Sequence, residues 1–324
     1  MRQHPATSLI LGIDGGGTKT VAWLAARGDG SPGNKDVVLG RGSAGPSNQR
    51  AVGPVVAMSN LDAAVETAFS DAHLDRRTVD AACLGLAGAD RESDRRIVER
   101  WAEEARLAHR VIVVNDAIPL LHAGSARGCG VALIAGTGSL AFGRNATGQS
   151  ARSGGWGYLF GDEGSAFAIG RAVLQAVTRA ADGRAPATRL LDDVLRQLAV
   201  SSASDIVTAV YSHEVPRAVI AGLAPRAFDA AASADHIAAE IVDLAATELA
   251  AMVVAVADRL ELRQELHLIL SGSVLLQQAS FREQVAKRIS ISGVDLQSTT
   301  IVQDAVAGAV EIARSLLLPG APRT

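Results

Sequence analysis

The sequence predicts an α/β protein made of two duplicated domains, each built on a mixed β-sheet, with a helical insert in the second. Three observations predict this fold class. An apolar strand that runs into a glycine-rich turn occurs near residue 10 and again near residue 131, strands and helices alternate after the first copy, and helical periodicity dominates residues 166–262. We place the domains at 1–120 and 121–303, with the insert at about 166–262 and a last helix at about 304–324 that packs back on the first domain.

The composition is that of a globular protein without a nucleic-acid or membrane partner. The 324 residues are 48% hydrophobic and 20% charged, and a net charge of −3 with interspersed acids and bases gives no basic face. No signal peptide or long apolar run is present, so we expect a cytoplasmic protein. Cys83 and Cys129 are the only cysteines, which argues against a disulfide framework or a cysteine metal site.

The first element is a strand at residues 8–14 that delivers a carboxylate, Asp14, to a turn of three glycines. Glycines let backbone N–H groups approach a ligand, Thr18 and Thr20 add hydroxyls, and Lys19 adds a positive charge. A carboxylate at a strand end can hold Mg²⁺ directly or through water, so we interpret this turn as a phosphate and metal site. A plain β-hairpin is the alternative, and the two interpretations are compatible.

Further strands of the first domain also end in polar residues. A strand at 35–42 leads to a loop that holds Asn48, for which an Asx-turn is the more common role. A strand at 110–114 ends at Asn115 and Asp116, where a buried structural carboxylate or a helix N-cap is the alternative to catalysis. Because polar residues at the carboxyl ends of strands line the ligand crevice of such sheets, we expect Asp14, Asn48 and Asp116 to lie there. The other expected elements of this domain are a helix at 52–74, a strand at 79–86 and a helix at 91–107.

The same plan begins again at Gly130. A strand at 131–135, a Gly-Thr-Gly-Ser turn at 136–139 and a return strand at 140–143 repeat the first hairpin. We interpret this repeat as an internal duplication that carries a second phosphate-binding turn.

The densest cluster of glycines and polar residues follows at 154–165. Its five glycines, Trp156 and two acids, Asp162 and Glu163, suit the wall of a pocket rather than a core element. The two acids also suit the N-terminus of the following helix, so helix capping is an alternative or additional role.

Helices fill the insert, and the sheet resumes after it. Gly272 and Ser273 form a turn before a short helix, where backbone N–H groups can meet a flat or anionic ligand, although a serine cap on a plain strand-to-helix turn is the commoner role. The expected helices lie at 166–181, 187–198, 204–211, 221–231, 234–260 and 304–318, and the expected strands at 265–270 and 299–302.

Together these motifs resemble the sugar kinase, heat-shock protein 70 and actin superfamily. Within it, the chain is similar to the N-acetylglucosamine kinase branch of the BadF/BadG/BcrA/BcrD ATPase family over nearly its whole length. The most specific match is the cluster at 154–165, with Gly-Gly-Trp-Gly followed by Gly-Asp-Glu-Gly-Ser. The resemblance implies two ribonuclease H-like (actin-like ATPase) domains, ATP and Mg²⁺ as cofactors, and an amino sugar as substrate.

The resemblance also implies roles for individual residues. Asp14 would organise Mg²⁺, and Asp116 would act as general base beside the sugar hydroxyl. The residues implied for the amino sugar are Asn48, Asp116, Gly155, Trp156, Gly157 and Asp162. Those implied for ATP are Gly16, Gly17, Thr18, Lys19, Gly136, Thr137 and Gly138 around the phosphates, and Ala221, Gly272 and Ser273 near the adenosine.

We therefore expect a homodimeric, ATP-dependent kinase that converts N-acetylglucosamine to N-acetylglucosamine 6-phosphate. Glucosamine and N-acetylmuramic acid are alternative substrates, because the sequence leaves the amide pocket undefined. The family also contains ATPases that activate dehydratases and reductases through an iron–sulfur cluster, but Cys83 and Cys129 lack the close spacing that such a cluster needs. A non-catalytic sugar-sensing regulator would need a DNA-binding segment, and the sequence shows no basic helix-turn-helix.

Overall fold

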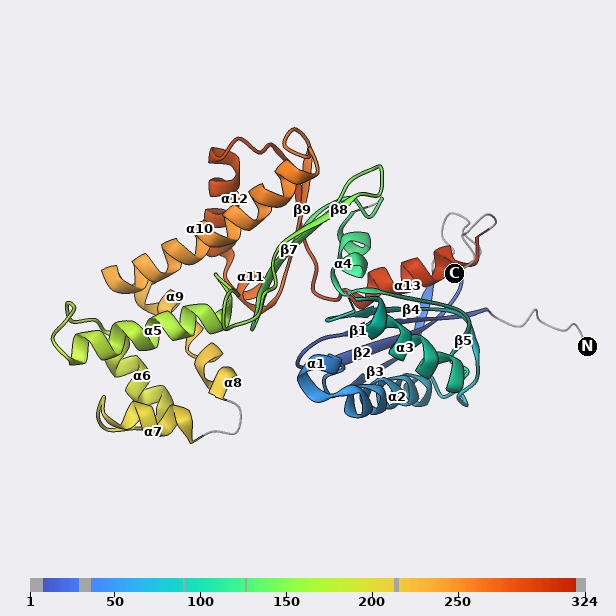
Figure 1. The fold of residues 1–324 in the computed structure, drawn as a ribbon, viewed down its shortest axis with the longest axis horizontal. Helices are drawn as coiled ribbons and strands as arrows, with labels where there is room; N and C mark the ends of the chain where they lie inside the picture. Colours follow the sequence, from blue (N-terminus) through green and yellow to red (C-terminus); the bar gives the residue numbers. More distant parts are fainter. Residues whose placement is uncertain (1–7, 29–35, 90, 126, 213–215, 319–324) are drawn as a thin grey trace, which may run out of the picture. The chain divides into compact units, whose positions relative to one another are not determined.

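The structure is a computed structural model that describes residues 8–28, 36–89, 91–125, 127–212 and 216–318. Lys35 and residues 1–7 and 319–324, on which parts of the expectations fall, lie outside the described residues. The chain forms two compact units, residues 1–128 with 304–324 and residues 129–303 (Figure 1). The boundary expected at 120/121 falls inside a helix, α4 (Ala117–Gly124).

The first unit is built on one five-stranded sheet. The helix predicted at 52–74 begins at Pro54 instead, because Gly53, with a φ of 80°, separates it from a short helix at 49–52 that the sequence did not predict. The strands are β1 (Leu9–Gly15), β2 (Thr20–Ala26), β3 (Val37–Ala44), β4 (Val79–Leu86) and β5 (Ala108–Asn115). The helices are α1 (Gln49–Val52), α2 (Pro54–Asp71), α3 (Glu92–Glu104), α4 and α13 (Val306–Ser315).

The second unit is built on another five-stranded sheet. The sequence did not predict β8, α8 or α12. The strands are β6 (Gly130–Ala135), β7 (Ser139–Arg144), β8 (Ser150–Gly154), β9 (Leu266–Ser271) and β10 (Leu296–Ile301). The helices are α5 (Ala166–Ala181), α6 (Leu190–Leu198), α7 (Asp205–Tyr211), α8 (Pro216–Ala221), α9 (Ala224–Ala232), α10 (His236–Arg259), α11 (Ser273–Gln277) and α12 (Ala279–Ile291).

The two sheets have equivalent strand orders, which confirms the predicted duplication. The order is β3-β2-β1-β4-β5 in the first sheet and β8-β7-β6-β9-β10 in the second. In each sheet the first two strands form an antiparallel hairpin, whereas β1, β4 and β5, like β6, β9 and β10, run parallel. Parallel strands bring their carboxyl ends to one side of a sheet, which we call the carboxyl edge.

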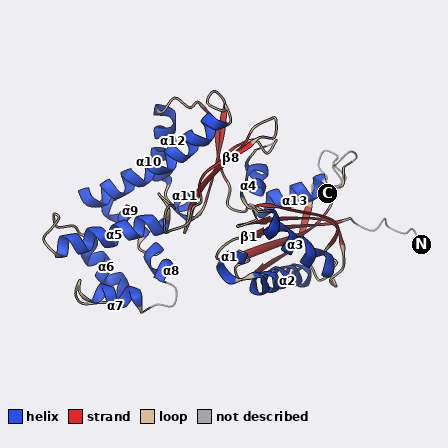
Figure 2. Ribbon diagram, in the orientation of Figure 1, coloured by secondary structure: helices blue, strands red, loops and turns tan. Residues whose placement is uncertain are grey.

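Both faces of the first sheet are covered by helices (Figure 2). Side chains alternate along a strand, so Leu9, Leu11 and Ile13 of β1 join the core beneath α2 and α3. Ile10 points the other way and packs with α13. Alternate side chains of β1 therefore contribute to the apolar cores on the two faces of the sheet.

α13 can approach β1 and α4 closely because glycines stand at both crossings. A Cβ at Gly12 of β1 would lie 2.6 Å from the backbone nitrogen of Val310, and a Cβ at Gly308 would collide with the carbonyl oxygen of Pro119. The last described helix is therefore an integral part of the first unit.

One hydrophobic core joins the sheet and the helices of the second unit. Val131 and Leu133 of β6 belong to the same buried cluster as Val253 and Val256 of α10. α10 contacts β7 and β8, and α12 packs against α10. The helical stretch that we expected as an insert thus shares its core with the sheet. In the described part of the chain, no helix combines the length and the hydropathy needed to cross a bilayer.

Candidate functional site

The carboxyl edge of the first sheet gathers three of the predicted site residues. Asp14 is the penultimate residue of β1, Asn48 follows β3, and Asp116 follows β5. β4 lies between β1 and β5 and pairs with both in parallel register. Since neighbouring strands lie about 4.8 Å apart, the ends of β1 and β5 are about 10 Å from each other.

The turn between β1 and β2 is tied to the loop that follows β3. The Gly16 N–H donates to the Lys19 carbonyl at 2.9 Å, which closes the turn. The Gly16 carbonyl accepts the N–H groups of Ser47 at 3.2 Å and Asn48 at 3.3 Å. Residues 17–19 are exposed, so their N–H and hydroxyl groups are accessible to a ligand.

Asn48 caps the short helix α1. Its Oδ1 accepts the N–H of Arg50 at 3.1 Å, which is the local turn that we weighed as the alternative role. The same oxygen lies close to Gly88 after β4, where a Cβ would be 3.0 Å away. The cap uses the amide oxygen, so a role of the amide nitrogen in sugar binding stays a prediction.

Ser47 and Gln49, on either side of Asn48, each have a buried polar atom without a hydrogen-bond partner among the described residues. These atoms are Ser47 Oγ and Gln49 Oε1. An unpaired buried polar group costs about 1–3 kcal/mol. Unfavourable buried polar groups of this kind cluster at functional sites, where the loop conformation serves binding rather than stability. Their presence here favours this loop as part of the site.

Asp14 is a partly buried carboxyl group with charged neighbours. Burial raises its pKa from 3.8 to about 6, the positive charge of Lys19 opposes this rise, and the negative charge of Asp304 adds to it. Asp304 precedes α13, and the sequence did not indicate it as a site residue because it comes from the far end of the chain. A carboxyl group that is costly to ionise, with a second carboxylate nearby, is stabilised by a cation.

This environment fits Mg²⁺ held jointly by protein and phosphate. Magnesium usually takes one or two carboxylates and completes its octahedron with phosphate oxygens and water. Asp14 and Asp304 supply such a pair. Among the described residues, no cluster of three or more His, Cys, Asp or Glu side chains could hold a metal ion by itself.

Asp116 occupies the N-cap position of α4 but does not cap that helix. Its side chain makes no capping hydrogen bond. The Oδ1 of Asn115 accepts the N–H of Ala117 at 2.9 Å instead. Asn115 therefore fills the capping role that we weighed against catalysis for Asp116, whose partly buried carboxylate lies at the carboxyl edge.

The carboxyl edge of the second sheet carries the second glycine turn. The Gly136 N–H donates to the Gly138 carbonyl at 2.9 Å, and the Gly136 carbonyl accepts the Ala166 N–H at 2.8 Å at the start of α5. Thr137, between the two glycines, is partly buried. The turn thus rests on the first residue of a long helix.

Gly272 lets the predicted ATP-binding turn at 272–273 pack against the glycine turn at 136–138. It has a φ of 92°, and a Cβ at this position would collide with the backbone of Ala135. A Cβ at Gly136 would lie 3.8 Å from the Ser273 nitrogen. The structure therefore brings together the turns at 136–138 and 272–273, which the sequence separates widely.

Asp162 is 4% exposed and adopts a left-handed conformation with a φ of 61°. Its Oδ1 accepts the Ser139 N–H at 3.3 Å, and its Oδ2 accepts a hydrogen bond from Arg217 Nη2 at 3.0 Å. Burial raises the pKa of Asp162, the Ser139 N–H and the Arg217 cation lower it, and Glu163 raises it. Ser165 rather than Asp162 caps α5. Sugar binding by Asp162 stays a prediction.

The Trp156 loop is an exposed apolar segment. Trp156 is 66% exposed, and the Arg152 guanidinium lies 5.1 Å from its ring centre. Gly155 and Gly157, with φ values of 70° and 84°, turn the chain on both sides of the indole. Clustered exposed apolar side chains mark a ligand or partner surface. Three more follow directly: Tyr158, Leu159 and Phe160.

α8 contains one residue that we named as a site residue from the sequence, Ala221, and one that we did not, Arg217. Ala221 ends α8 and packs against the core of the second unit. Its predicted place near the adenosine stays a prediction. Arg217, the ion-pair partner of Asp162, was missed because a single arginine in a helical stretch gives no signal of its own.

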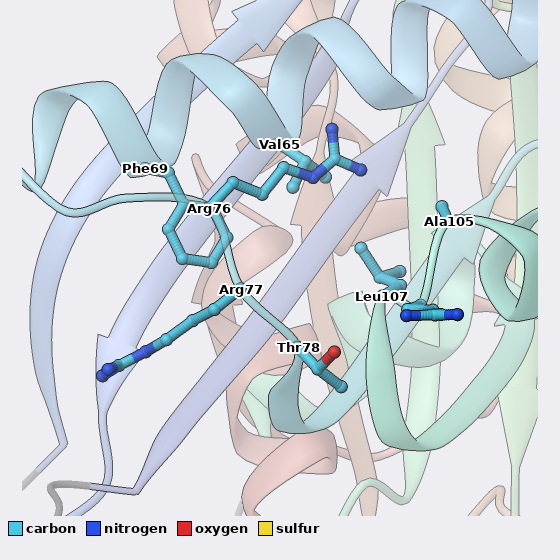
Figure 3. Close-up of a pocket in the computed structure, with 8 residues that line it drawn as sticks. Val65, Phe69, Arg76, Arg77, Thr78, Ala105 and Leu107 are labelled. Atoms are coloured by element: carbon cyan, nitrogen blue, oxygen red, sulfur yellow. The ribbon is translucent and has the colours of Figure 1, made fainter.

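A pocket of about 300 Å³ lies at the opposite edge of the first sheet (Figure 3). Thr78, just before β4, and Leu107, just before β5, line it together with Val65 and Phe69 of α2. These are the amino ends of the strands, away from Asp14. This pocket is therefore separate from the candidate site.

The BadF/BadG/BcrA/BcrD ATPase family matches residues 11–313 of the chain. The match extends from β1 into α13 and so covers both units.

Two curated relatives are similar over most of the chain. The N-acetylmuramic acid/N-acetylglucosamine kinase of Clostridium acetobutylicum is 32% identical over 307 residues, which cover 94% of this chain and 98% of the relative. The N-acetyl-D-glucosamine kinase of Dictyostelium discoideum is 32% identical over 294 residues, which cover 87% of this chain and 90% of the relative.

A solved structure has the same fold. The crystal structure of a candidate N-acetylglucosamine kinase from Chromobacterium violaceum is 24% identical, covers 95% of this chain and 100% of its own, and superposes with a TM-score of 0.71. The similarity confirms the expected fold class, with two duplicated actin-like domains.

Proposed function

Because the chain belongs to the BadF/BadG/BcrA/BcrD ATPase family, we propose that it is a sugar kinase that transfers the γ-phosphoryl group of ATP to O6 of N-acetylglucosamine. The observation that carries this proposal is the similarity to two amino-sugar kinases at 32% identity over most of the chain. The position of Asp116 at the carboxyl edge, where its side chain makes no capping hydrogen bond to α4, is compatible with the proposal.

In the proposed reaction, O6 of the sugar attacks the γ-phosphorus, the bond from this phosphorus to the β,γ-bridging oxygen breaks, and ADP leaves. Asp116 accepts the proton of the O6 hydroxyl as general base. Little covalent chemistry falls to the protein in such a reaction, so alignment and charge neutralisation carry most of the catalysis.

We assign the phosphates to the two glycine turns. Backbone N–H groups at 16–18 and 136–138 and the hydroxyls of Thr18 and Thr137 would bind phosphate oxygens. Bound Mg²⁺ supplies positive charge that offsets the charge developing on the phosphates. Asp14, with Asp304 nearby, would hold the ion directly or through water, and the raised pKa of Asp14 supports this assignment.

We assign the amino sugar to Asn48, Asp116, Asp162 and the turn around Trp156. The exposed indole and the left-handed glycines beside it allow a small polar ligand to reach both the ring and the backbone. N-acetylmuramic acid is the second candidate substrate, because the Clostridium relative is named for both sugars. Glucosamine is a weaker candidate. We further expect a homodimer that works in the cytoplasm.

A substrate panel tests the proposal most directly. ADP release would be measured with ATP, Mg²⁺ and glucose, glucosamine, N-acetylglucosamine, N-acetylmannosamine or N-acetylmuramic acid. The largest kcat/KM is expected for N-acetylglucosamine. The highest value for a sugar without an N-acetyl group would move the assignment to that sugar, and ADP release that no sugar stimulates would contradict the kinase proposal.

Tryptophan fluorescence tests the sugar assignment separately from turnover. N-acetylglucosamine is expected to change the emission of the exposed Trp156 without nucleotide, and Asp162→Ala is expected to abolish this change. Trp156→Phe is the control, because it leaves Trp23 and Trp101 as reporters. A response to ATP alone, with none to any amino sugar, would assign the loop to the nucleotide.

A further inference from the structure

Arg217 joins both ends of the segment at residues 158–162. Its Nη2 donates to Asp162 Oδ2 at 3.0 Å. Its guanidinium carbon lies 5.0 Å from the ring centre of Tyr158 and 5.9 Å from that of Phe167. The rings of Tyr158 and Phe167 meet edge to face at 5.3 Å. One side chain of α8 therefore contacts both the aromatic side and the carboxylate side of this loop.

The placement of Arg217 is costly in one respect. Its Nε is buried and has no hydrogen-bond partner among the described residues. A buried donor without an acceptor is unfavourable, so stability alone does not explain an arginine here. The planar guanidinium can stack on rings and donate in its own plane at the same time, which a lysine cannot do.

We propose that Arg217 is the positioning residue of the amino-sugar site, which holds the Asp162 carboxylate and the Tyr158 ring in the arrangement that the sugar binds. This inference rests on the proposed function, in which Asp162 and Trp156 bind the sugar. Arg217 acts through these neighbours. Asp162 also accepts the N–H of Ser139, directly after the glycine turn at 136–138, so its position is set from both sides.

Two charged groups act on Asp162. Arg217 favours its ionised form and Glu163, in the same loop, disfavours it, while burial disfavours ionisation most strongly. Loss of the Arg217 cation therefore raises the pKa of Asp162 further. A protonated Asp162 has lost an acceptor for a sugar hydroxyl, so sugar binding weakens as the pH falls. When Arg217 is removed, this acidic loss of sugar binding begins at a higher pH than in wild type.

Arg226 of α9 offers a matched control in the same unit. Its Nη2 lies 3.2 Å from Asp229 Oδ2, and its Nε is also buried without a partner. Asp229 is an exposed residue of α9 and not a predicted site residue. Arg226→Met thus removes the same kind of cation and ion pair from a neighbouring helix.

The test compares wild type, Arg217→Met, Arg217→Lys and Arg226→Met in the full chain. KM for N-acetylglucosamine, KM for ATP, kcat and melting temperature would be measured from pH 5.5 to 8.5. Arg217→Met is expected to raise the sugar KM about tenfold or more, the effect of one lost charge-assisted hydrogen bond, with the ATP KM changed less than about twofold. The acidic fall in 1/KM for the sugar is expected to move to higher pH.

Arg217→Lys keeps the charge without the planar fork, so it is expected to recover part of the sugar affinity and most of the wild-type pH profile. It also keeps the test decisive if Arg217→Met does not fold. Arg226→Met is expected to match wild type in both KM values. Unchanged sugar KM and pH profile in Arg217→Lys and in any folded Arg217→Met, or an equal effect of Arg226→Met, would overturn the inference. Wild-type protein that phosphorylates no amino sugar would instead overturn the proposed function and, with it, this role of Arg217.

Discussion

The carboxyl edges of the two sheets differ in chemistry although their strands follow equivalent orders. β1 ends in Asp14 and Gly15, whereas β6 ends in Ile134 and Ala135. The first edge carries a carboxyl group whose pKa burial raises to about 6, with Asp116 beyond β5. The second edge has an apolar strand end and closely packed glycine turns.

The two units thus share a duplicated fold but carry different chemistry at their carboxyl edges. In the first unit, carboxylates line the edge, which suits a metal ion and a proton acceptor. In the second unit, backbone N–H groups and the ion pair between the buried Asp162 and the partly exposed Arg217 line the edge, which suits binding and orientation. We infer that the first unit supplies the reactive groups and the second unit mainly holds the ligands.

The strongest test of this division is Asp116→Asn, which is nearly isosteric but cannot accept a proton. We expect kcat to fall by about 10²–10⁴-fold, the usual effect of losing a positioned general base. The melting temperature should stay close to that of wild type, because Asn115 provides the cap of α4. Both quantities would be measured on the same preparation.

Asp80 provides the control at the amino end of β4. Its Oδ2 accepts the hydroxyl of Ser8 at 2.9 Å and the N–H of Leu9 at 2.8 Å, so its role is structural. Asp80→Asn is expected to lower the melting temperature with little change in kcat. A stable Asp116→Asn protein with wild-type kcat would remove Asp116 from the mechanism.

A second test uses the cost of ionising Asp14. Its pKa in the folded protein, about 6, lies above the value of 3.8 expected in the unfolded chain, so the folded state binds more protons between these values. Stability contributed by this group is therefore greatest at low pH and is lost as the pH rises through 6. Asp14→Asn removes the cost, so at pH 7 the metal-free variant should be more stable than wild type by about 1–3 kcal/mol.

Thermal unfolding from pH 4 to 7.5 checks this expectation. The advantage of Asp14→Asn should shrink steadily towards pH 4, where the wild-type carboxyl is protonated in the folded protein and partly protonated in the unfolded chain. Mg²⁺ with ATP should stabilise wild type and not the variant, and the variant should lose turnover. A variant less stable than wild type at pH 7 would contradict the environment described for Asp14.

The smallest expected effect concerns the hydroxyls of the two glycine turns. Thr18→Val and Thr137→Val are each expected to weaken ATP binding about tenfold through the loss of one hydrogen bond to a charged phosphate, and to spare sugar binding. Calorimetry with a non-hydrolysable ATP analogue would measure both variants. An unchanged ATP affinity in either variant would exclude that turn from the phosphate site and show that only the other turn binds phosphate.

The sequence predicted the frame of both edges because buried strands and glycine turns leave strong local signals. β4 was predicted with its observed limits, Val79–Leu86, and the family match confirms the resemblance on which the implied roles depend. β8 was missed because its segment, Ser-Ala-Arg-Ser-Gly, has no apolar alternation and its pairing with β7 alone defines it.

Contacts between residues that are far apart in the sequence could not be predicted from local sequence patterns. Asp304 acts on Asp14 only because α13 packs against β1. Arg217 meets Asp162 only because α8 packs on α5, which begins after the loop. The role of Asn115 as the cap of α4, in place of its neighbour, depends on side-chain rotamers that residue types do not determine.

The return of α13 to the first sheet has a consequence for synthesis on the ribosome. Residues 129–303 separate the first stretch of that unit from its last helix. Translation proceeds at about 5–20 residues per second. The sheet face around Ile10, Ala81 and Cys83 is therefore made some tens of seconds before α13, which covers it in the complete protein. In the finished protein, burial raises the pKa of the Cys83 thiol far above its ordinary value and makes it unreactive. We expect that thiol to be accessible before α13 is made, so brief alkylation during translation would mark the molecules in which α13 has not yet packed on the sheet.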